Sequence, residues 1–251
     1  MKAIFIAAGF GSRLKSETKD IPKPLVEING CSILERQVSL FKKNGIKDIV
    51  IIVGPQKDKF TLKDVRYIHD VDFDKHEQLG SLMAAKSEIN DDVIILFADI
   101  LFDEIVLNQI LQSTDDMAIA LDLDWEKSYL ERTDNPSSEA DKILIKNEKI
   151  LKISKNIDSH NDDEKIGEFL GIMKLSKNGG DILLKKYSNL KKHHVGSFHT
   201  ANSFQQAYLT DMLQEIIDSG IDISPIVVDG NWCEIDTVED LEKVKSSSMF
   251  I

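Results

Sequence analysis

The 251-residue sequence is poor in cysteine, has fewer basic than acidic side chains, and has no long apolar run. Its two cysteines, Cys31 and Cys233, are far apart and fit no metal-ligand spacing, so we expect reduced thiols in a reducing compartment. The apolar stretch at the N-terminus ends within about ten residues, whereas a membrane helix needs about 20. We therefore expect a cytoplasmic protein with no membrane partner.

Basic residues are outnumbered, because 31 lysines and arginines face 43 acidic residues and the formal net charge is −12. An acidic surface argues against binding to nucleic acid or to an anionic membrane, both of which need a basic face. A pocket for an anionic ligand would then have to be locally basic or carry a metal ion. The histidines show no His-x-Glu or Glu-x-x-His spacing, which argues against a zinc site.

Apolar runs of strand length alternate with amphipathic helical windows through the first half of the chain. Strands are predicted at residues 2–6, 48–53, 93–97 and 117–121, and helices at 32–44, 81–89 and 104–112. Ser32 and Glu35 form a capping box for the first helix, and Gly45 supplies its C-terminal stop. This order of strands and helices predicts a largely parallel sheet in a three-layer α/β fold.

The second half has a less regular pattern. A hairpin (142–146 and 150–153), a long strand (168–175), two short strands (225–228 and 232–235) and helices (181–187, 203–219 and 237–245) are predicted. Residues 158–165 are polar and charged, which predicts a mobile loop. With no repeat and no clear linker, we expect one domain over residues 1–251. Its fold would be Rossmann-like, with a mixed, mostly parallel central sheet.

The strongest motif is AAGFGSRL at residues 7–14, directly after the first predicted strand. Small residues let the backbone approach a phosphate, and consecutive N–H groups can hold its oxygens. The spacing is neither that of a dinucleotide fold nor that of a Walker loop. A lone glycine-rich turn could be a tight connection only. Arg13 and Lys23, the latter fixed between Pro22 and Pro24, favour phosphate binding instead.

Acidic residues follow two later strands. Asp99 lies just after the run at 93–97, at the edge where open α/β sheets place their ligands. Glu234 and Asp236 flank Ile235, so on a strand both carboxylates point to one face. Mg²⁺ prefers such oxygen ligands, and we predict a Mg²⁺ site. The alternatives are a turn or cap role for Asp99 and a hydrogen-bonded structural role for Glu234.

AAGFGSRL followed by PKPL resembles the signature of the nucleotidyltransferases that activate sugar phosphates and related small phosphates. The resemblance implies one α/β nucleotidyltransferase domain that releases pyrophosphate. Its N-terminal half would bind the nucleotide and its C-terminal half would complete the acceptor site. The family commonly has glycine where Ala98 stands here, a small difference. The implied nucleotide-binding residues are Ala7, Ala8, Gly9, Phe10, Gly11, Ser12, Arg13, Gln78, Gly80 and Ser81, and the implied metal ligands are Asp99, Glu234 and Asp236.

Within that family, the short chain and the stretches FADILF (97–102) and GEFLG (167–171) look like the cytidylyltransferases for phosphocholine, 2-aminoethylphosphonate or 2-hydroxyethylphosphonate. The resemblance implies transfer of CMP from CTP to a small phosphonate or phosphate acceptor, with Arg13 and Lys23 catalytic. Trp125 could cover a quaternary ammonium, and Lys155 could equally be a solvated surface lysine. The implied acceptor-binding residues are Lys155, Asp122, Asp124, Glu168 and Asp211.

Two other functions are compatible with the sequence, and a homodimer is possible in each case. A sugar-1-phosphate nucleotidyltransferase would use UTP, dTTP or GTP on the same fold. A catalytically dead, nucleotide-sensing regulatory subunit would be favoured by loss of Arg13, Lys23 or an acidic ligand, but all of these are present.

Overall fold

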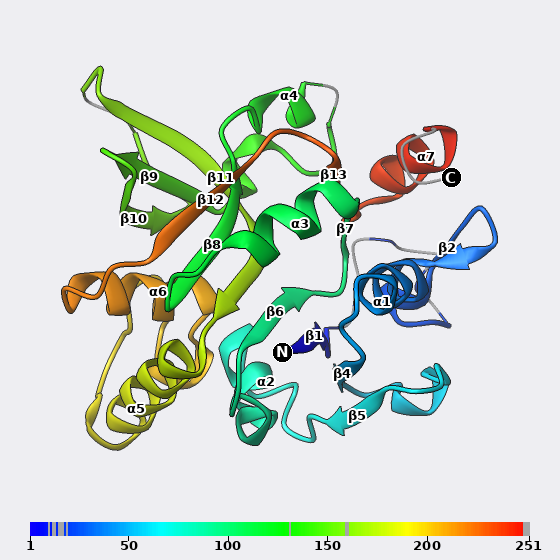
Figure 1. The fold of residues 1–251 in the computed structure, drawn as a ribbon, viewed down its shortest axis with the longest axis horizontal. Coiled ribbons are helices and arrows are strands. Elements are labelled where there is room, and N and C mark those ends of the chain that lie inside the picture. Colours follow the sequence, from blue (N-terminus) through cyan, green and yellow to red (C-terminus); the bar gives the residue numbers. More distant parts are fainter. Residues whose placement is uncertain are drawn as a thin grey trace.

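A mixed β-sheet with helices on both faces forms the centre of the molecule (Figure 1). The computed structural model describes residues 1–9, 11, 14, 18, 20–130, 132–158 and 161–247. Its strands are β1 (Lys2–Ala7), β2 (Glu27–Ile28), β3 (Cys31–Ser32), β4 (Asp48–Val53), β5 (Arg66–His69), β6 (Val93–Phe97), β7 (Ile100–Phe102), β8 (Met117–Asp122), β9 (Lys142–Lys146), β10 (Lys149–Ser154), β11 (Glu164–Leu175), β12 (Ser224–Val228) and β13 (Trp232–Glu234). Its α-helices are α1 (Ile33–Lys43), α2 (Gln78–Ala84), α3 (Glu104–Gln112), α4 (Glu126–Tyr129), α5 (Lys177–His193), α6 (Leu209–Asp218) and α7 (Val238–Ser246).

The nine-stranded sheet has a parallel core. β1 lies between β4 and β6, parallel to both, and β5 continues the parallel order beyond β4. The long strand β11 runs antiparallel to β6, β8 and β9, and β12 pairs in parallel with β8. The sheet is therefore mixed and its centre is parallel, as predicted.

Side chains alternate across the sheet and fill two separate cores. In β1, Ile4 and Ile6 face the core that α2, α5 and α6 cover, whereas Ala3 and Phe5 face the core of α1 and α3. This period of two is what a strand buried on both faces requires. The helices on both faces confirm the predicted three-layer arrangement.

Several elements differ from the sequence-based expectation. β5 and β7 were not predicted, because each is short and β5 lies at the sheet edge with half-exposed side chains. The loop expected over 158–165 ends earlier than predicted, since β11 begins at Glu164 and pairs with β9. The predicted helix 203–219 begins only at Leu209, where Asp211 accepts a hydrogen bond from the backbone N–H of Tyr208.

The ends of β6 and β13 lie close together although they are far apart in the sequence. β13 pairs antiparallel with β7, which directly follows the turn after β6, so Glu234 lies opposite Ile100. The backbone N–H of Ile235 donates to the carbonyl of Asp99 at 3.1 Å. This pairing brings the C-terminal acidic residues to the carboxyl end of the parallel core. Within the described residues, no helix has the length and apolar character needed to cross a membrane, and both cysteines are free.

Candidate active site

Two adjoining hollows open at the carboxyl ends of the parallel strands, with volumes of about 480 and 490 Å³. We call the first the acidic hollow and the second the glycine-loop hollow. The shared lining residues are Ile6, Gly9, Gln78, Asp99 and Asp236. The two hollows therefore form one cleft, and Asp99 and Asp236 stand at their junction.

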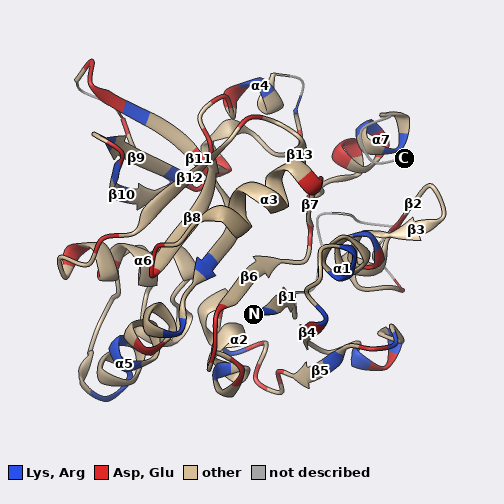
Figure 2. Cartoon of the chain, viewed as in Figure 1, with Lys and Arg blue, Asp and Glu red and all other residues tan. Residues whose placement is uncertain are grey.

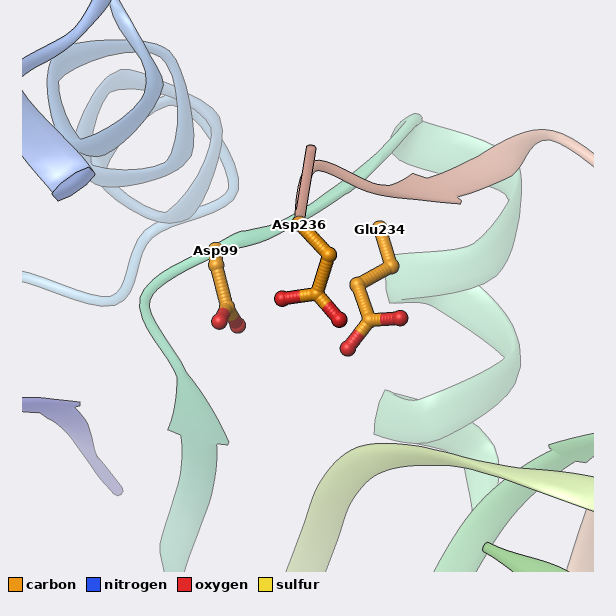
Figure 3. Close-up of side chains that lie close together, drawn as sticks. All are labelled: Asp99, Glu234 and Asp236. Carbon is orange, nitrogen blue, oxygen red and sulfur yellow. The ribbon is translucent and has the colours of Figure 1, made fainter. Parts of the chain in front are cut away.

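Three carboxylates meet at that junction. One oxygen of each of Asp99, Glu234 and Asp236 lies within 4.8 Å of the others, and Figure 3 shows the three side chains converging. Asp99 Oδ1 is buried and has no hydrogen-bond donor among the described residues. A buried carboxylate oxygen without a donor, in a set of purely oxygen ligands, fits a divalent cation. The predicted metal ligands are thus brought together.

Lys23 lies at the same junction. Its ammonium contacts Asp99 Oδ2 at 2.7 Å and also donates to Asp236 Oδ1. Burial works to lower the pKa of Lys23, but the neighbouring carboxylates, Asp99 first, outweigh it and raise that pKa. Burial and the negative charges of Asp236 and Asp99 raise the pKa of Glu234 well above its ordinary value. Four ionisable groups thus meet in one place, where Lys23 and Asp236 are buried and Asp99 and Glu234 are partly buried, and such a cluster suits a charged ligand.

The glycine loop positions the stem of Lys23. Gly11 has φ +63°, and a Cβ on it would lie 2.6 Å from the Cβ of Lys23. A side chain at position 11 would therefore push the lysine away. Of the predicted loop residues, Ala7, Ala8, Gly9 and Gly11 line the glycine-loop hollow, whereas Phe10, Ser12 and Arg13 lie outside the described residues.

The start of α2 forms the far wall of the glycine-loop hollow. Gln78 lines both hollows, and Ser81 lines this one while donating to Asp70 Oδ2 at 2.8 Å. His76 Nε2 lies 3.1 Å from Asp70 Oδ1, and its ring occupies the space that a side chain on Gly80 would need. Asp70, which sequence reasoning missed, therefore fixes two groups of this wall.

A short segment after α4 holds the three clustered carboxylates in place. Asn135 Nδ2 donates to Asp236 Oδ2 at 3.1 Å. Arg132 makes a two-pronged contact to Asp240 at 2.7 and 2.9 Å and lies 3.7 Å from Glu234. Asp240 in turn accepts from the backbone N–H of Asp236 at 3.0 Å. No sequence signal pointed to Arg132, Asn135 or Asp240.

Three of the predicted acceptor residues line the acidic hollow. Lys155 does so while its ammonium pairs with Glu139 at 2.8 Å. Asp211 is buried, with its oxygens accepting from Thr200 and from the backbone of Tyr208. Glu168 is also buried; burial raises its pKa to about 7, although the hydrogen bond from the Tyr129 hydroxyl opposes this.

The other two predicted acceptor residues lie elsewhere. Asp122 is buried and accepts from Trp232 Nε1 and from the backbone N–H of Asp124, both at 2.7 Å. Asp124 is exposed and pairs with Lys127. Neither side chain lines either hollow. Asp122 instead orients Trp232, which does line the acidic hollow.

The first half of the chain matches a family model. Residues 3–129, about half of the chain, match the MobA-like NTP transferase domain. A CTP:phosphoglutamine cytidylyltransferase of Campylobacter jejuni subsp. jejuni is 29% identical, over 96% of this chain and 98% of that protein. A choline-phosphate cytidylyltransferase of Streptococcus pneumoniae is 36% identical, over 45% of this chain and 52% of that protein.

Solved structures share the fold. The CTP:phosphocholine cytidylyltransferase of Streptococcus pneumoniae (LicC) superposes with a TM-score of 0.71 at 24% identity, covering 97% of each chain. The family match, the fold and the glycine loop beside Lys23 and three carboxylates agree with one another. The chain belongs to the MobA-like NTP transferase family and is a nucleotidyltransferase.

Proposed function

We propose that this chain is a cytidylyltransferase, which transfers CMP from CTP to a small phosphorylated acceptor and releases pyrophosphate. The observation that carries the proposal is the junction of the two hollows, where Lys23 contacts Asp99 and Asp236. The cytidine preference is supported by three relatives: a CTP:phosphoglutamine cytidylyltransferase, a choline-phosphate cytidylyltransferase and a CMP-5′-(3-aminopropyl)phosphonate synthase.

The nucleotide occupies the glycine-loop hollow. Its phosphates lie against the backbone of Gly9 and Gly11, which can approach closely because these residues have no side chain. Arg13 lies outside the described residues, and its position in the motif predicts that it adds positive charge to this site. The base lies against the wall that Gln78 and Ser81 form at the start of α2.

The acceptor occupies the acidic hollow, with its phosphate or phosphonate toward the junction. An ionised oxygen of that group attacks the α-phosphorus, a new P–O bond forms, and the bond to pyrophosphate breaks. The nucleophile needs no general base, because the oxygen is already charged. Lys23 bridges the α-phosphate and the incoming oxygen and offsets the repulsion between the two anions.

A divalent cation, Mg²⁺ by this proposal, would be held by Asp99, Glu234 and Asp236 and would neutralise and orient the α-phosphate when bound. Asn135 and Asp240 keep Asp236 in place for that task. The far end of the acceptor is cationic, because carboxylates from several elements line the acidic hollow. Figure 2 shows acidic positions on the ribbon near β11 and β13.

Pyrophosphate release tests the proposal directly. The purified chain with Mg²⁺ is assayed with CTP, UTP, GTP, ATP and dTTP, each against phosphonates, phosphocholine, phosphoethanolamine and sugar phosphates. We expect release with CTP and an acceptor that carries an amine or ammonium. Release only with a sugar phosphate and another nucleotide would replace the cytidine proposal. Nucleotide binding without any release would favour a regulatory subunit.

A further inference from the structure

The acidic hollow has more negative charge than its own cations can neutralise. Lys155 is the single lysine or arginine in its described lining, and its ammonium already pairs with Glu139. Asp211 accepts three hydrogen bonds and Glu234 lies 3.7 Å from Arg132. Glu139, Asp211 and Glu234 therefore each have a hydrogen-bonding or charged partner within the protein.

Apart from Asp99 at the junction, two carboxylates in the hollow are not accounted for in this way. Glu168 is 5% exposed, and its Oε2 has no hydrogen-bond donor in the part of the chain that the structure describes. Asp141 lines the same hollow and is partly exposed in it. Burial of a carboxylate without a donor is costly unless a ligand supplies the missing contact.

Asp141 and Glu168 are neighbours in the sheet. Lys142 on β9 pairs with Glu168 on β11, and the backbone N–H of Phe169 donates to the carbonyl of Asp141 at 2.8 Å. The charge of Asp141 contributes to the raised pKa of Glu168, after burial as the main cause. The main cause of the raised pKa of Asp141 is also burial. A cationic group close to both carboxylates would offset the cost of burying their negative charges.

A cationic N–H donor on the ligand can supply the missing contact. A primary ammonium has three N–H groups and can satisfy both carboxylates. A trimethylammonium has none and is held by aromatic faces instead. Trp125, the aromatic residue that the sequence offered for that purpose, does not line the hollow, and its ring faces Lys142 Nζ at 5.6 Å. Other aromatic residues do line the hollow: Phe97, Tyr129, Phe169, Tyr208 and Trp232. A trimethylammonium held by those rings would still leave Glu168 Oε2 without a donor.

We propose that Asp141 and Glu168 form an ammonium subsite that selects acceptors with a primary amine over acceptors with a trimethylammonium group. The inference rests on the proposed cytidylyl transfer and specifies its acceptor class. Glu168 holds the ammonium at the floor of the subsite, where the Tyr129 hydroxyl fixes its other oxygen. Asp141, which lines the same hollow, is the second carboxylate that contacts it.

An N-methylation series tests this selection. The kcat/KM for CMP transfer is measured with phosphoethanolamine, its N-methyl and N,N-dimethyl derivatives, and phosphocholine. We expect kcat/KM to fall at each step and at least tenfold over the series. Glu168→Gln and Asp141→Asn should reduce the ratio between the first and last members at least threefold. Asp163→Asn, which removes an exposed carboxylate just before β11, at the far end of its pairing with β9, should leave the ratio unchanged.

The possible results separate the inference from the function on which it rests. Equal or better turnover of phosphocholine in the wild type would overturn the ammonium subsite and leave cytidylyl transfer intact. A ratio that stays at its wild-type value in both Glu168→Gln and Asp141→Asn would also overturn it. If no acceptor releases pyrophosphate from CTP, calorimetry of phosphoethanolamine against phosphocholine in the presence of CTP still measures the selection, and equal affinities would overturn it.

Discussion

The two hollows of the cleft are built in different ways. Apart from Asp236, the lining of the glycine-loop hollow falls inside residues 3–129, the part that matches the family model. Most of the acidic hollow is lined by residues beyond that part, from Asn135 to Asp236. The first hollow therefore lies in the part of the chain that matches the family model, and most of the second lies outside it. Under the proposed function, a nucleotide phosphate would meet backbone and a lysine, whereas an acceptor would meet carboxylates.

The largest expected effect is at the junction, where both hollows depend on Lys23. Lys23→Met should lower kcat by about 100- to 1000-fold, the usual loss when one charge-stabilising donor of a transition state is removed. The same variant should bind Mn²⁺ more tightly than the wild type in the absence of nucleotide. The reason is that the Lys23 ammonium occupies Asp99 Oδ2 and Asp236 Oδ1 in this structure and would compete with a metal ion.

Electron paramagnetic resonance of free Mn²⁺ measures that affinity independently of turnover. Thermal unfolding serves as the control for folding. Weaker or unchanged Mn²⁺ binding in Lys23→Met would show that the lysine and the metal do not compete. Near-normal turnover would remove Lys23 from the proposed chemistry.

The sequence was informative where function depends on neighbouring residues. The glycine loop and Lys23 lie within one short stretch, so small residues and fixed cations could be recognised together. Glu234 and Asp236 share a face because of strand alternation, and Asp99 follows a buried strand, so their meeting could be predicted from the order of elements. Fold class followed from the same periodicities.

The acidic hollow could not be predicted in the same way. Asp141 and Glu168 are brought together by pairing of β9 with β11, and a single sequence does not give that register. Asp122 and Asp124 looked equivalent to Glu168 as acidic residues near strand ends. The hydrogen bond from Trp232 to Asp122 and the exposure of Asp124 separate them from it. Which carboxylate lacks a partner is a property of tertiary packing alone.

The next largest effect tests whether the buried charge of Glu168 in the acidic hollow destabilises the folded protein. Glu168→Gln should stabilise the folded protein at pH 8 by up to about 3 kcal/mol, because a rise in pKa from 4.5 to about 7 penalises the ionised form. The unfolded state releases the proton at lower pH than the folded state, so wild-type stability falls as pH rises from about 4.5 to about 7. Glutamine removes that loss and keeps an acceptor for the Tyr129 hydroxyl.

Urea denaturation at pH 4.5 and pH 8 gives the two free energies of unfolding. Glu168→Gln should be more stable than the wild type at pH 8 and equally stable at pH 4.5. Asp163→Asn should show no such gain in stability at either pH. Equal effects of Glu168→Gln at both pH values would mean that Glu168 is not strained by its burial.

A smaller effect is expected for the bracing segment, which belongs to the acidic hollow but acts on the shared metal ligands. Asn135→Ala should weaken Mn²⁺ binding about 10- to 100-fold, the usual range when a residue that orients a metal ligand is lost. The KM for CTP at saturating metal should change little, because Asn135 does not line the glycine-loop hollow. A change in CTP affinity with unaltered Mn²⁺ binding would contradict this positioning role.

The smallest expected effect is the sharpest test of the difference between the two hollows, because it should alter binding in the acidic hollow alone. Thr200→Val removes one of three hydrogen bonds to Asp211, the 2.7 Å contact from the Thr200 hydroxyl, and keeps the one from the Thr200 backbone at 2.9 Å. The expected cost is about 1 kcal/mol. It should appear as a severalfold higher KM for the acceptor, since Thr200 and Asp211 both line the acidic hollow. Neither residue lines the glycine-loop hollow, so the KM for CTP should stay within about twofold of the wild type.

Steady-state kinetics with each substrate varied separately gives both constants. Parallel increases in the two would mean that the hollows respond as one unit, and the division between a shared nucleotide half and a distinctive acceptor half would then fail.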